Sequence, residues 1–553
     1  MGLIQPSLPD FDLDAWRRQP FATRVRMACE SWALDGWGSP TSAYLFYAVK
    51  LGVFIGGWVW LTARVSPGGL DNVSQWWASP RAVEQAVLWA MLFEGLGLGC
   101  GSGPLTARFI PPFGGMLHFA RPGTTRLPPW PGRVPLTRGH LRTPVDAALY
   151  LGAVAAVVAA LLSPRVDDRL LLAIAVLIPL VGLRDRTVFL AFRSEHYLLA
   201  VLVFLLADDP LPGIKAVMLA IWVGAALSKV NHHFPNVVTV MLSNSPVMRS
   251  RAIRRRLYRD FPGDLRPSRL ATRLAHTGTA VEFTFPLVLA FSSGGNVTRV
   301  ALLVMIAFHL NILSSVPAGV PLEWNVVFIH GAMALFGSQA QVRFWAIDDP
   351  LLAVILLVAC VVVPIWGNVR PDQLSFLPSM RYYAGNWPVS AWLFRPGALE
   401  KIDERIVSVS RTPMRQLAMF YDDNTTQLML AKAGAFRSMH VHGRLVHQCM
   451  ALAVDDLDDY QWIEGELIAG IALGWNFGDG HLHQEQLLEA LQAQVGWGRG
   501  DVVGVFIEGQ PLGKPALHWR IVDCVDGLLE EGHADVNDLR QRQPWQPEPT
   551  RTG

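Results

Sequence analysis

Charged residues are scarce in this sequence. They make up 17% of its 553 residues, against about one quarter in soluble globular proteins, while hydrophobic residues reach 51%. The mean hydropathy of +0.29 is also high. These figures exclude an ordinary soluble domain and predict a chain that crosses a lipid bilayer several times. The small net charge of +2 gives no indication of a nucleic-acid partner.

Cysteines are few, and the sequence lacks the motifs of the common catalytic sites. The five cysteines form no CxxC pair, which excludes a disulfide framework and fits a reducing compartment for the soluble parts. No GxGxxG, Walker loop, HExxH or GxSxG stands in a convincing context. The N-terminal residues MGLIQPSLPDFDLDAW have no apolar core, so we expect no cleavable signal peptide.

Apolar stretches of membrane-spanning length dominate residues 43–370, where we expect an all-α polytopic helix bundle of about ten spans. Residues 1–42 are expected to form a cytoplasmic or interfacial lead-in. Lys and Arg concentrate in alternate loops, which places both termini in the cytoplasm under the positive-inside rule. The expected spans are 43–63, 84–103, 145–163, 169–183, 187–207, 213–230, 275–292, 298–316, 324–338 and 349–367.

The composition changes after the last expected span. Residues 371–396 are rich in aromatic residues and proline, and we expect them to lie along the membrane interface. Residues 397–540 alternate helix and strand patterns, which predicts a small soluble α+β domain. Residues 541–553 are expected to form a disordered tail.

Lys229 is the strongest functional signal, because a charged group within a bilayer needs a partner, water or a function. Lys229 and His233 are four residues apart and would share one helix face. Apolar surroundings favour the neutral amine, which is a usable general base. The alternative is a lysine that extends toward the lipid headgroups.

Other polar side chains fall in the same leaflet under this topology, so we expect them to share one pocket with Lys229. Lys229, His233 and His309 would be catalytic, and the remaining residues would bind the substrate. The alternative is a structural ion-pair network within the bundle. The substrate-binding candidates are Glu195, His196, His276, Glu282, Asn311 and Glu323.

Histidine pairs in the expected soluble domain are possible metal ligands. MHVHGRLVHQC contains His440 and His442, and GDGHLH contains His481 and His483. An HxH pair on a strand directs both rings to one face, which suits a metal ion. The spacing matches no standard zinc pattern, however, and GDG before HLHQEQLLEALQ is also typical of a turn that enters a helix. We therefore predict no metal site and identify no cofactor.

The stretch IWVGAALSKVNHHFPNVVTVMLSNSP resembles the lysine-containing signature of the horizontally transferred transmembrane domain found in vitamin K-dependent γ-carboxylases. GTAVEFTFPLVLAF and TRVALLVMIAFHLNIL are similar to its next two helices, and the resemblance covers about residues 145–370. In that family a membrane lysine is the base that acts on a reduced quinone. The resemblance implies this role for Lys229, with Glu282 and His309 lining the pocket.

Two departures from the carboxylases exclude a simple transfer of their activity. Their large extracytoplasmic β-rich domain is missing, and the expected topology turns Lys229 toward the cytoplasm. Peptide γ-carboxylation is therefore not expected, and a quinone, isoprenoid or acyl-lipid substrate remains.

The whole chain is still more similar to an actinobacterial family of multi-pass membrane proteins without a defined function. The shared stretches are GLGCGSGPLTARFIPP, RLPPWPGRVPLTRG, LSKVNHHFP, VPLEWNVVFIHG and GDGHLH. We therefore predict a bacterial inner-membrane enzyme that acts on a lipophilic substrate, with membrane lipids as partners and no nucleic acid. The alternative is a non-catalytic lipid carrier or scaffold. The sequence does not indicate the oligomeric state.

Overall fold

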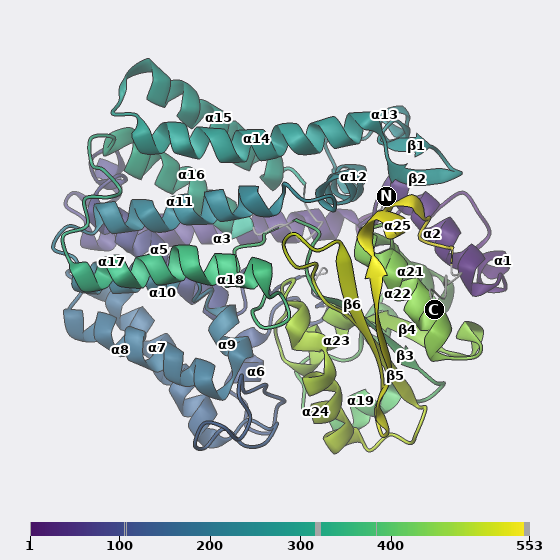
Figure 1. Cartoon of the computed structure of the whole chain (residues 1–553). Helices are drawn as coiled ribbons and strands as arrows, with labels where there is room; N and C mark the ends of the chain where they lie inside the picture. The colour runs from purple at the N-terminus through teal and green to yellow at the C-terminus, as the bar shows by residue number, and fades with distance from the viewer. Residues whose placement is uncertain (1, 104–105, 107, 316–321, 383, 547–553) are drawn as a thin grey trace.

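The computed structural model describes residues 2–103, 106, 108–315, 322–382 and 384–546. Long helices lie side by side in a bundle, and a β-sheet with its covering helices adjoins one end of that bundle (Figure 1). Six helical segments in the described part are long and apolar enough to cross a membrane. They are α3 (Thr41–Val65), α7 (Pro144–Leu162), α11 (Leu211–Ser228), α14 (Arg269–Phe291), α15 (Gly295–Leu313) and Pro350–Val369, which comprises α17 (Pro350–Leu357), η4 (Val358–Val362) and α18 (Val363–Val369).

The expected count of about ten spans is not confirmed, because four of the expected stretches form shorter or interrupted helices. The stretch 187–207 is broken at 192–196, where Arg193 has a positive φ of 51°. The stretch 84–103 ends early, where Gly97 takes a left-handed conformation with a φ of 69°. Residue 316, the end of another expected span, lies outside the described residues. The shorter helices are α5 (Pro80–Gly95), α8 (Asp168–Arg184), α9 (Arg186–Ala191), α10 (Tyr197–Leu206) and α16 (Leu322–Gly331), which continues as η3 (Ala332–Ser338).

A five-stranded antiparallel sheet forms the centre of the C-terminal unit, with strand order β4-β3-β5-β6-β7. This small sheet agrees with the expected α+β composition of the region. Its strands are β3 (Val389–Phe394), β4 (Gln461–Glu464), β5 (Val502–Ile507), β6 (Ala516–Asp523) and β7 (Gly527–Asp535). The covering helices include α21 (Asp423–Ser438), α22 (Val441–Ala453), α23 (Gly465–Ala472) and α24 (Glu485–Val495).

Strand β3 lies within residues 371–396, which the sequence predicted to lie along the membrane interface. Its six residues are all buried, and it pairs with β4 on one side and β5 on the other. Helices α22 and α23 contact it. A strand that is buried on both faces has no polar face, so its sequence is a continuous apolar run. The run VSAWLF therefore has the same composition as a segment that lies along a membrane interface.

The N-terminal segment belongs structurally to the C-terminal unit. Helix α2 (Phe21–Asp35) packs against α21, and α1 (Leu13–Arg17) is joined to α21 by the ion pair Arg17–Asp423 at 2.5 Å. Trp32 of α2 is fully buried and donates to the Val240 carbonyl of α12 (Phe234–Asn244) at 3.1 Å. Residues 1–42, expected as a polar lead-in, therefore supply part of the core. At the other end of the chain, α25 (Val536–Gln541) completes the unit, and residues 547–553 of the expected tail lie outside the described part.

The proline- and arginine-rich stretch after α5 lies between the bundle and the C-terminal unit. Its Arg108 is buried, and its Nη2 donates to the Gly470 carbonyl of α23 at 2.8 Å. A Cβ atom at Gly470 would lie 2.4 Å from the Thr106 carbonyl oxygen. The absence of a side chain at Gly470 thus permits the close contact that fixes α23 against the bundle.

Candidate functional site

Lys229 follows directly after the last residue of α11, and its ammonium group forms an ion pair with Glu282 of α14. Both side chains are buried, with exposed fractions of 8% and 6%. Burial of either charge alone would be unfavourable, so each stabilises the other. The pair therefore joins two of the candidate spans.

His309 of α15 lies near this pair and is hydrogen-bonded through both ring nitrogens. Trp222 Nε1 donates to His309 Nε2 at 3.0 Å, which identifies Nε2 as the unprotonated nitrogen. Nδ1 then carries the hydrogen and donates to Asn325 Oδ1 at 2.8 Å. The ring stacks on Phe328 with centroids 5.3 Å apart. Neither nitrogen is free to accept a proton without the loss of a bond.

Three other predicted site residues belong to a separate polar group. Glu323 of α16 pairs with Lys50 of α3 at 2.8 Å, and Glu195 pairs with Arg193 at 2.8 Å. The Arg193 guanidinium lies 4.0 Å from the centroid of the Trp324 ring, and the His196 ring stacks on the same tryptophan with centroids 4.7 Å apart. Helix α16 thus contributes to both groups. Its Glu323 and Trp324 belong to this one, and its Asn325 and Phe328 contact His309 in the other.

His233, His276 and Asn311 do not join either group. His276 and Asn311 are exposed. Helix α11 ends at Ser228, and Asn231 accepts from the backbone N–H groups of His233 and Phe234 at the start of α12, so Lys229 and His233 do not share a helix face. His233 instead hydrogen-bonds through Nε2 to Gln510 at 2.7 Å. Burial lowers the pKa of His233 to about 4.

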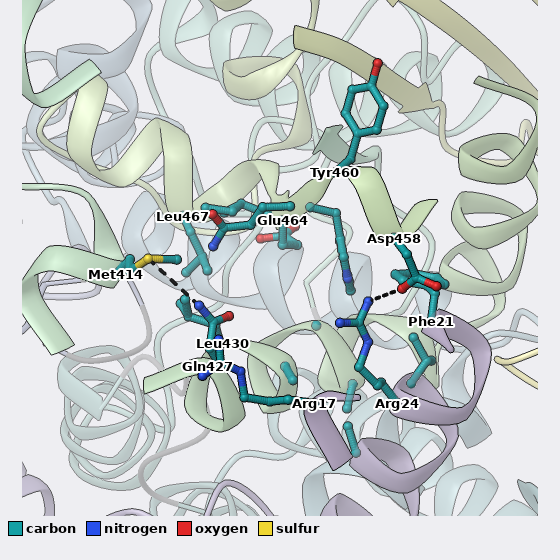
Figure 2. A pocket seen from close by; sticks show the side chains of 18 of the residues that line it. Arg17, Phe21, Arg24, Met414, Gln427, Leu430, Asp458, Tyr460, Glu464 and Leu467 are labelled. Atoms are coloured by element: carbon teal, nitrogen blue, oxygen red, sulfur yellow. Dashed lines mark hydrogen bonds and ion pairs between the residues drawn. The ribbon is translucent and has the colours of Figure 1, made fainter. Parts of the chain in front are cut away.

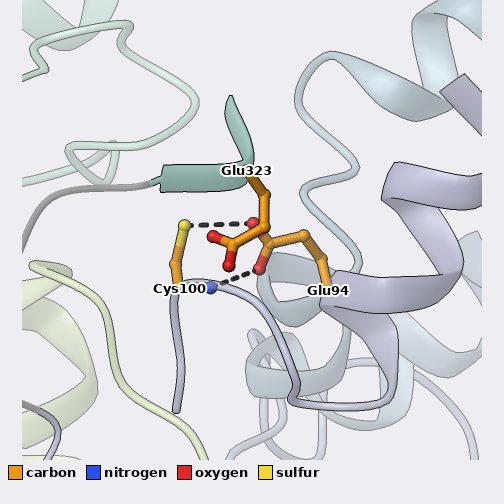
Figure 3. Close-up of side chains that lie close together, drawn as sticks. All are labelled: Glu94, Cys100 and Glu323. Atoms are coloured by element: carbon orange, nitrogen blue, oxygen red, sulfur yellow. Dashed lines mark hydrogen bonds between the residues drawn. The ribbon is translucent and has the colours of Figure 1, made fainter. Parts of the chain in front are cut away.

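Glu94 and Cys100 lie beside Glu323 and were not among the predicted site residues (Figure 3). The backbone N–H of Cys100 donates to Glu94 Oε2 at 2.8 Å, and its thiol donates to Oε1 at 3.0 Å. Burial raises the pKa of the Cys100 thiol well above its usual range, so the thiol stays protonated at neutral pH. The glycines in GLGLGCGSG are the sequence signal: a Cβ at Gly99 would lie 2.1 Å from the Glu94 carboxylate.

Cys100 and Lys50 also line a cavity of about 100 Å³ between the bundle and the C-terminal unit, called the inner cavity here. Arg437, Glu464 and Glu466 line it from the C-terminal unit. Aromatic side chains form much of the remaining wall. They are Trp37, Tyr47, Phe376, Trp387, Phe436 and Phe477.

A larger pocket of about 450 Å³, called the outer pocket here, lies between the N-terminal helices and the C-terminal unit (Figure 2). Arg24 and Asp458 form an ion pair at 2.6 Å on its wall. Glu464 and Leu467 line both the outer pocket and the inner cavity. These two residues therefore stand between the two spaces.

Glu464 belongs to a buried charged group at this position. Arg437 contacts it at 3.2 Å and contacts Glu466 at 2.9 Å. Burial raises the pKa of Glu464 to about 8, although Arg437 lowers it. One ring nitrogen of His483 lies within 4.8 Å of a carboxylate oxygen of each glutamate.

Among the described residues, the other histidines considered as metal ligands belong to no such group. His440 and His442 stand at the start of α22, so the expectation that they share a strand face is wrong. The segment continues into a helical run up to Ala453, and its hydrophobic residues recur at helical spacing. His440 contacts the Phe436 carbonyl at 2.7 Å, and His481 pairs with Glu508 at 3.1 Å.

A family of proteins described as transmembrane proteins of unknown function (DUF3556) matches residues 1–551. Because the match covers nearly the whole chain, the protein belongs to this family and is a transmembrane protein. The expected membership in a membrane family without a defined function is confirmed. No curated protein and no solved structure matches the chain.

Proposed function

We propose that the protein is a membrane enzyme that acts on a lipophilic substrate whose polar head occupies the inner cavity. The observation that carries the proposal is the lining of this cavity, in which aromatic rings surround Lys50, Arg437 and Cys100. Ligand sites combine apolar walls with a few placed polar groups in this way. About 100 Å³ accommodates a small ring or carbonyl head and not a whole lipid.

An apolar cavity inside the bundle supports the lipophilic part of the proposal. It has about 60 Å³ and is lined by side chains of α5, α10, α11 and α16, including His196 and Trp324. Arg193 contacts Trp324 and lies 3.5 Å from the Cys100 thiol of the inner cavity. A substrate with a polar head in the inner cavity would thus have its tail directed toward apolar surroundings.

The substrate classes that fit are a quinone, an isoprenoid or an acyl lipid, in line with the resemblance of Lys229 and its neighbours to the carboxylase-type membrane domain. Lys50 and Arg437 would bind the oxygen atoms of the head. The pairing of Lys229 with Glu282, and of both His309 nitrogens, favours a structural role for that group over the role of base. The same pairing supports the alternative of a non-catalytic lipid carrier or scaffold.

We further propose that the protein lies in the bacterial inner membrane with both termini in the cytoplasm. The charge asymmetry of the loops supports this orientation. So does the packing of α2 against α21, which holds the first and last parts of the chain in one unit on one side of the bundle.

Mass spectrometry of lipids and quinones retained by the detergent-purified protein tests the proposal. Ala433 of α21 lines the inner cavity, so Ala433→Phe would fill it. Ala493→Phe, at an exposed position of α24, is the matched control. We expect one lipophilic species to be enriched with the wild type and the control and lost with Ala433→Phe. The same species in all three, or only bulk phospholipid, would contradict the proposal.

The masses of the retained lipophilic species distinguish an enzyme from a non-catalytic carrier. An enzyme is expected to retain a second species that differs from the first by one chemical step, and Arg437→Lys should change the ratio of the two. A single unmodified species in every variant would identify a carrier. Lys229→Ala in the same experiment shows whether Lys229 contributes to the chemistry.

A further inference from the structure

Two carboxylates on the wall of the inner cavity lie beside one buried imidazole. Glu464 ends β4, Glu466 lies in the first turn of α23, and His483 ends the short helix η6 (Gly480–His483). One possible ligand atom from each lies within 4.8 Å of the other two. Glu464 and His483 are buried, and Glu466 is partly buried.

One ring nitrogen of His483 has no hydrogen-bond partner among the described residues. The Ser390 hydroxyl lies 2.6 Å from His483 Nδ1 and donates to the His483 carbonyl oxygen at 3.0 Å. A hydroxyl has one hydrogen, so Nδ1 must carry its own hydrogen and donate to Ser390. Nε2 then bears the lone pair, and this buried nitrogen has no hydrogen-bond partner among the described residues. Metal-binding histidines are held in this manner, with the second nitrogen donating to an oxygen.

The two carboxyl groups offer more oxygen atoms than Arg437 engages. The Arg437 guanidinium contacts one oxygen of Glu464 at 3.2 Å and one oxygen of Glu466 at 2.9 Å. Oε1 of Glu464 is buried, and its contact with Arg437 Nε at 3.2 Å lacks hydrogen-bond geometry, so among the described residues it accepts no hydrogen bond. A divalent cation would satisfy this oxygen, because buried charges are stable when paired or bound to metal.

Gly465 allows the three groups to converge. A Cβ atom at this position would lie 1.8 Å from Ser390 Oγ and 2.6 Å from His483 Nδ1. Only glycine fits between the two glutamates while His483 and Ser390 lie against the same turn. The backbone from β4 into α23 is thus shaped around the imidazole.

We propose that Glu464, Glu466 and His483 bind a divalent transition-metal ion that faces the inner cavity. Carboxylate and imidazole donors suit Zn²⁺, Mn²⁺ or Fe²⁺, and three protein ligands leave positions open for water or substrate. The inference deepens the proposed function, because a metal ion here would contact a head group in the same cavity.

A second group of this kind, Glu94, Cys100 and Glu323, does not carry the same proposal. Lys50 already pairs with Glu323 at 2.8 Å. Both oxygens of the Glu94 carboxylate accept hydrogen bonds from Cys100, one from its backbone N–H and one from its thiol. The donor atoms of this group are therefore already engaged within the protein.

Zinc binding to the full-length protein in detergent tests the site. The protein would be treated with a chelator, equilibrated with Zn²⁺ and analysed for bound zinc by elemental mass spectrometry. We expect about one zinc per chain, and a loss of affinity of about tenfold or more in His483→Gln and Glu466→Gln. His447→Gln, a buried histidine of α22 outside the group, is the control and should bind as the wild type does.

Absence of zinc from the folded wild type, or equal binding by the wild type and both ligand variants, would overturn the proposal. If His483→Gln does not elute as a folded protein, Glu466→Gln decides, because its position is partly exposed. The measurement needs no lipid. Failure to bind zinc leaves the substrate proposal standing, and failure to retain a lipid leaves the metal site standing.

Discussion

Lys229 and Glu282 form an ion pair that joins the end of α11 to α14. Removal of one member of a buried pair leaves the other charge without a partner, whereas removal of both does not. The pair therefore distinguishes a structural from a chemical role for Lys229.

Lys229→Met is expected to destabilise the protein by about 3–5 kcal/mol, because it leaves the Glu282 carboxylate buried and unpaired. Lys229→Met combined with Glu282→Leu should recover most of this loss. The measurement is the thermal unfolding midpoint in detergent. Lys401→Met is the control, since its pair with Asp501 is partly exposed to solvent and contributes little to stability. A Lys229→Met variant of unchanged stability that no longer converts substrate would instead assign the lysine to chemistry.

Two glycines of α3 provide a test of the packing between α3 and α5. A Cβ at Gly57 would lie 2.5 Å from the Trp89 ring, whose Nε1 donates to the Phe54 carbonyl at 2.8 Å. Gly57→Ala should therefore cost about 1–3 kcal/mol. A Cβ at Gly52 would meet no atom within 4 Å, so Gly52→Ala should be neutral or slightly stabilising. Equal thermal midpoints of the two variants would contradict this contact.

His447 predicts an acid-dependent loss of stability. Ser438 donates to the Gly434 carbonyl, so His447 Nε2 carries the hydrogen that it shares with Ser438, and Nδ1 is the site that a second proton would occupy. Nδ1 is buried without a hydrogen-bond partner among the described residues, and burial lowers the pKa of His447 to about 4. An unfolded histidine has a pKa of about 6.5.

The lower pKa in the folded state means that the unfolded chain binds the proton first as the pH falls. The contribution of His447 to the free energy of unfolding is therefore fully present above pH 6.5. This contribution, about 3 kcal/mol, is lost as the pH falls from 6.5 to 4. We expect the thermal midpoint of His447→Gln to depend less on pH over this interval than that of the wild type. Parallel pH profiles for the two proteins would show that His447 does not titrate in this way.

The proposed orientation predicts the behaviour of topology reporters in a bacterial host. A fluorescent protein at either terminus should be fluorescent, because it folds in the cytoplasm, and alkaline phosphatase at either terminus should be inactive. Alkaline phosphatase inserted between α7 and α8 should be active. Opposite results at the two termini would require an odd number of spans and exclude the proposed topology.

The sequence predicted the apolar bundle because bilayer length and composition are local properties. The sequence also indicated that Lys229 needs a partner, because a charge at the end of an apolar run is unfavourable without one. The partner is Glu282, which was among the predicted residues. The break at Arg193 was not predictable, since it depends on Glu195 and on Trp324 from a distant helix. The sequence placed His440 on a strand, because a short polar segment lacks the periodicity that distinguishes helix from strand. It placed His233 on the same helix as Lys229, because it gave no sign that α11 ends at Ser228.

The ion pair between Arg17 and Asp423 spans 406 residues of sequence. At synthesis rates of about 5–20 residues per second, roughly 20 to 80 s separate the two residues as they leave the ribosome. During that time the apolar face of α2 has no α21 to cover it, while the spans between them enter the membrane. The apolar face of α2 must therefore be shielded by the membrane surface or a chaperone until α21 has been synthesised. The C-terminal unit, which borders both cavities, is completed last.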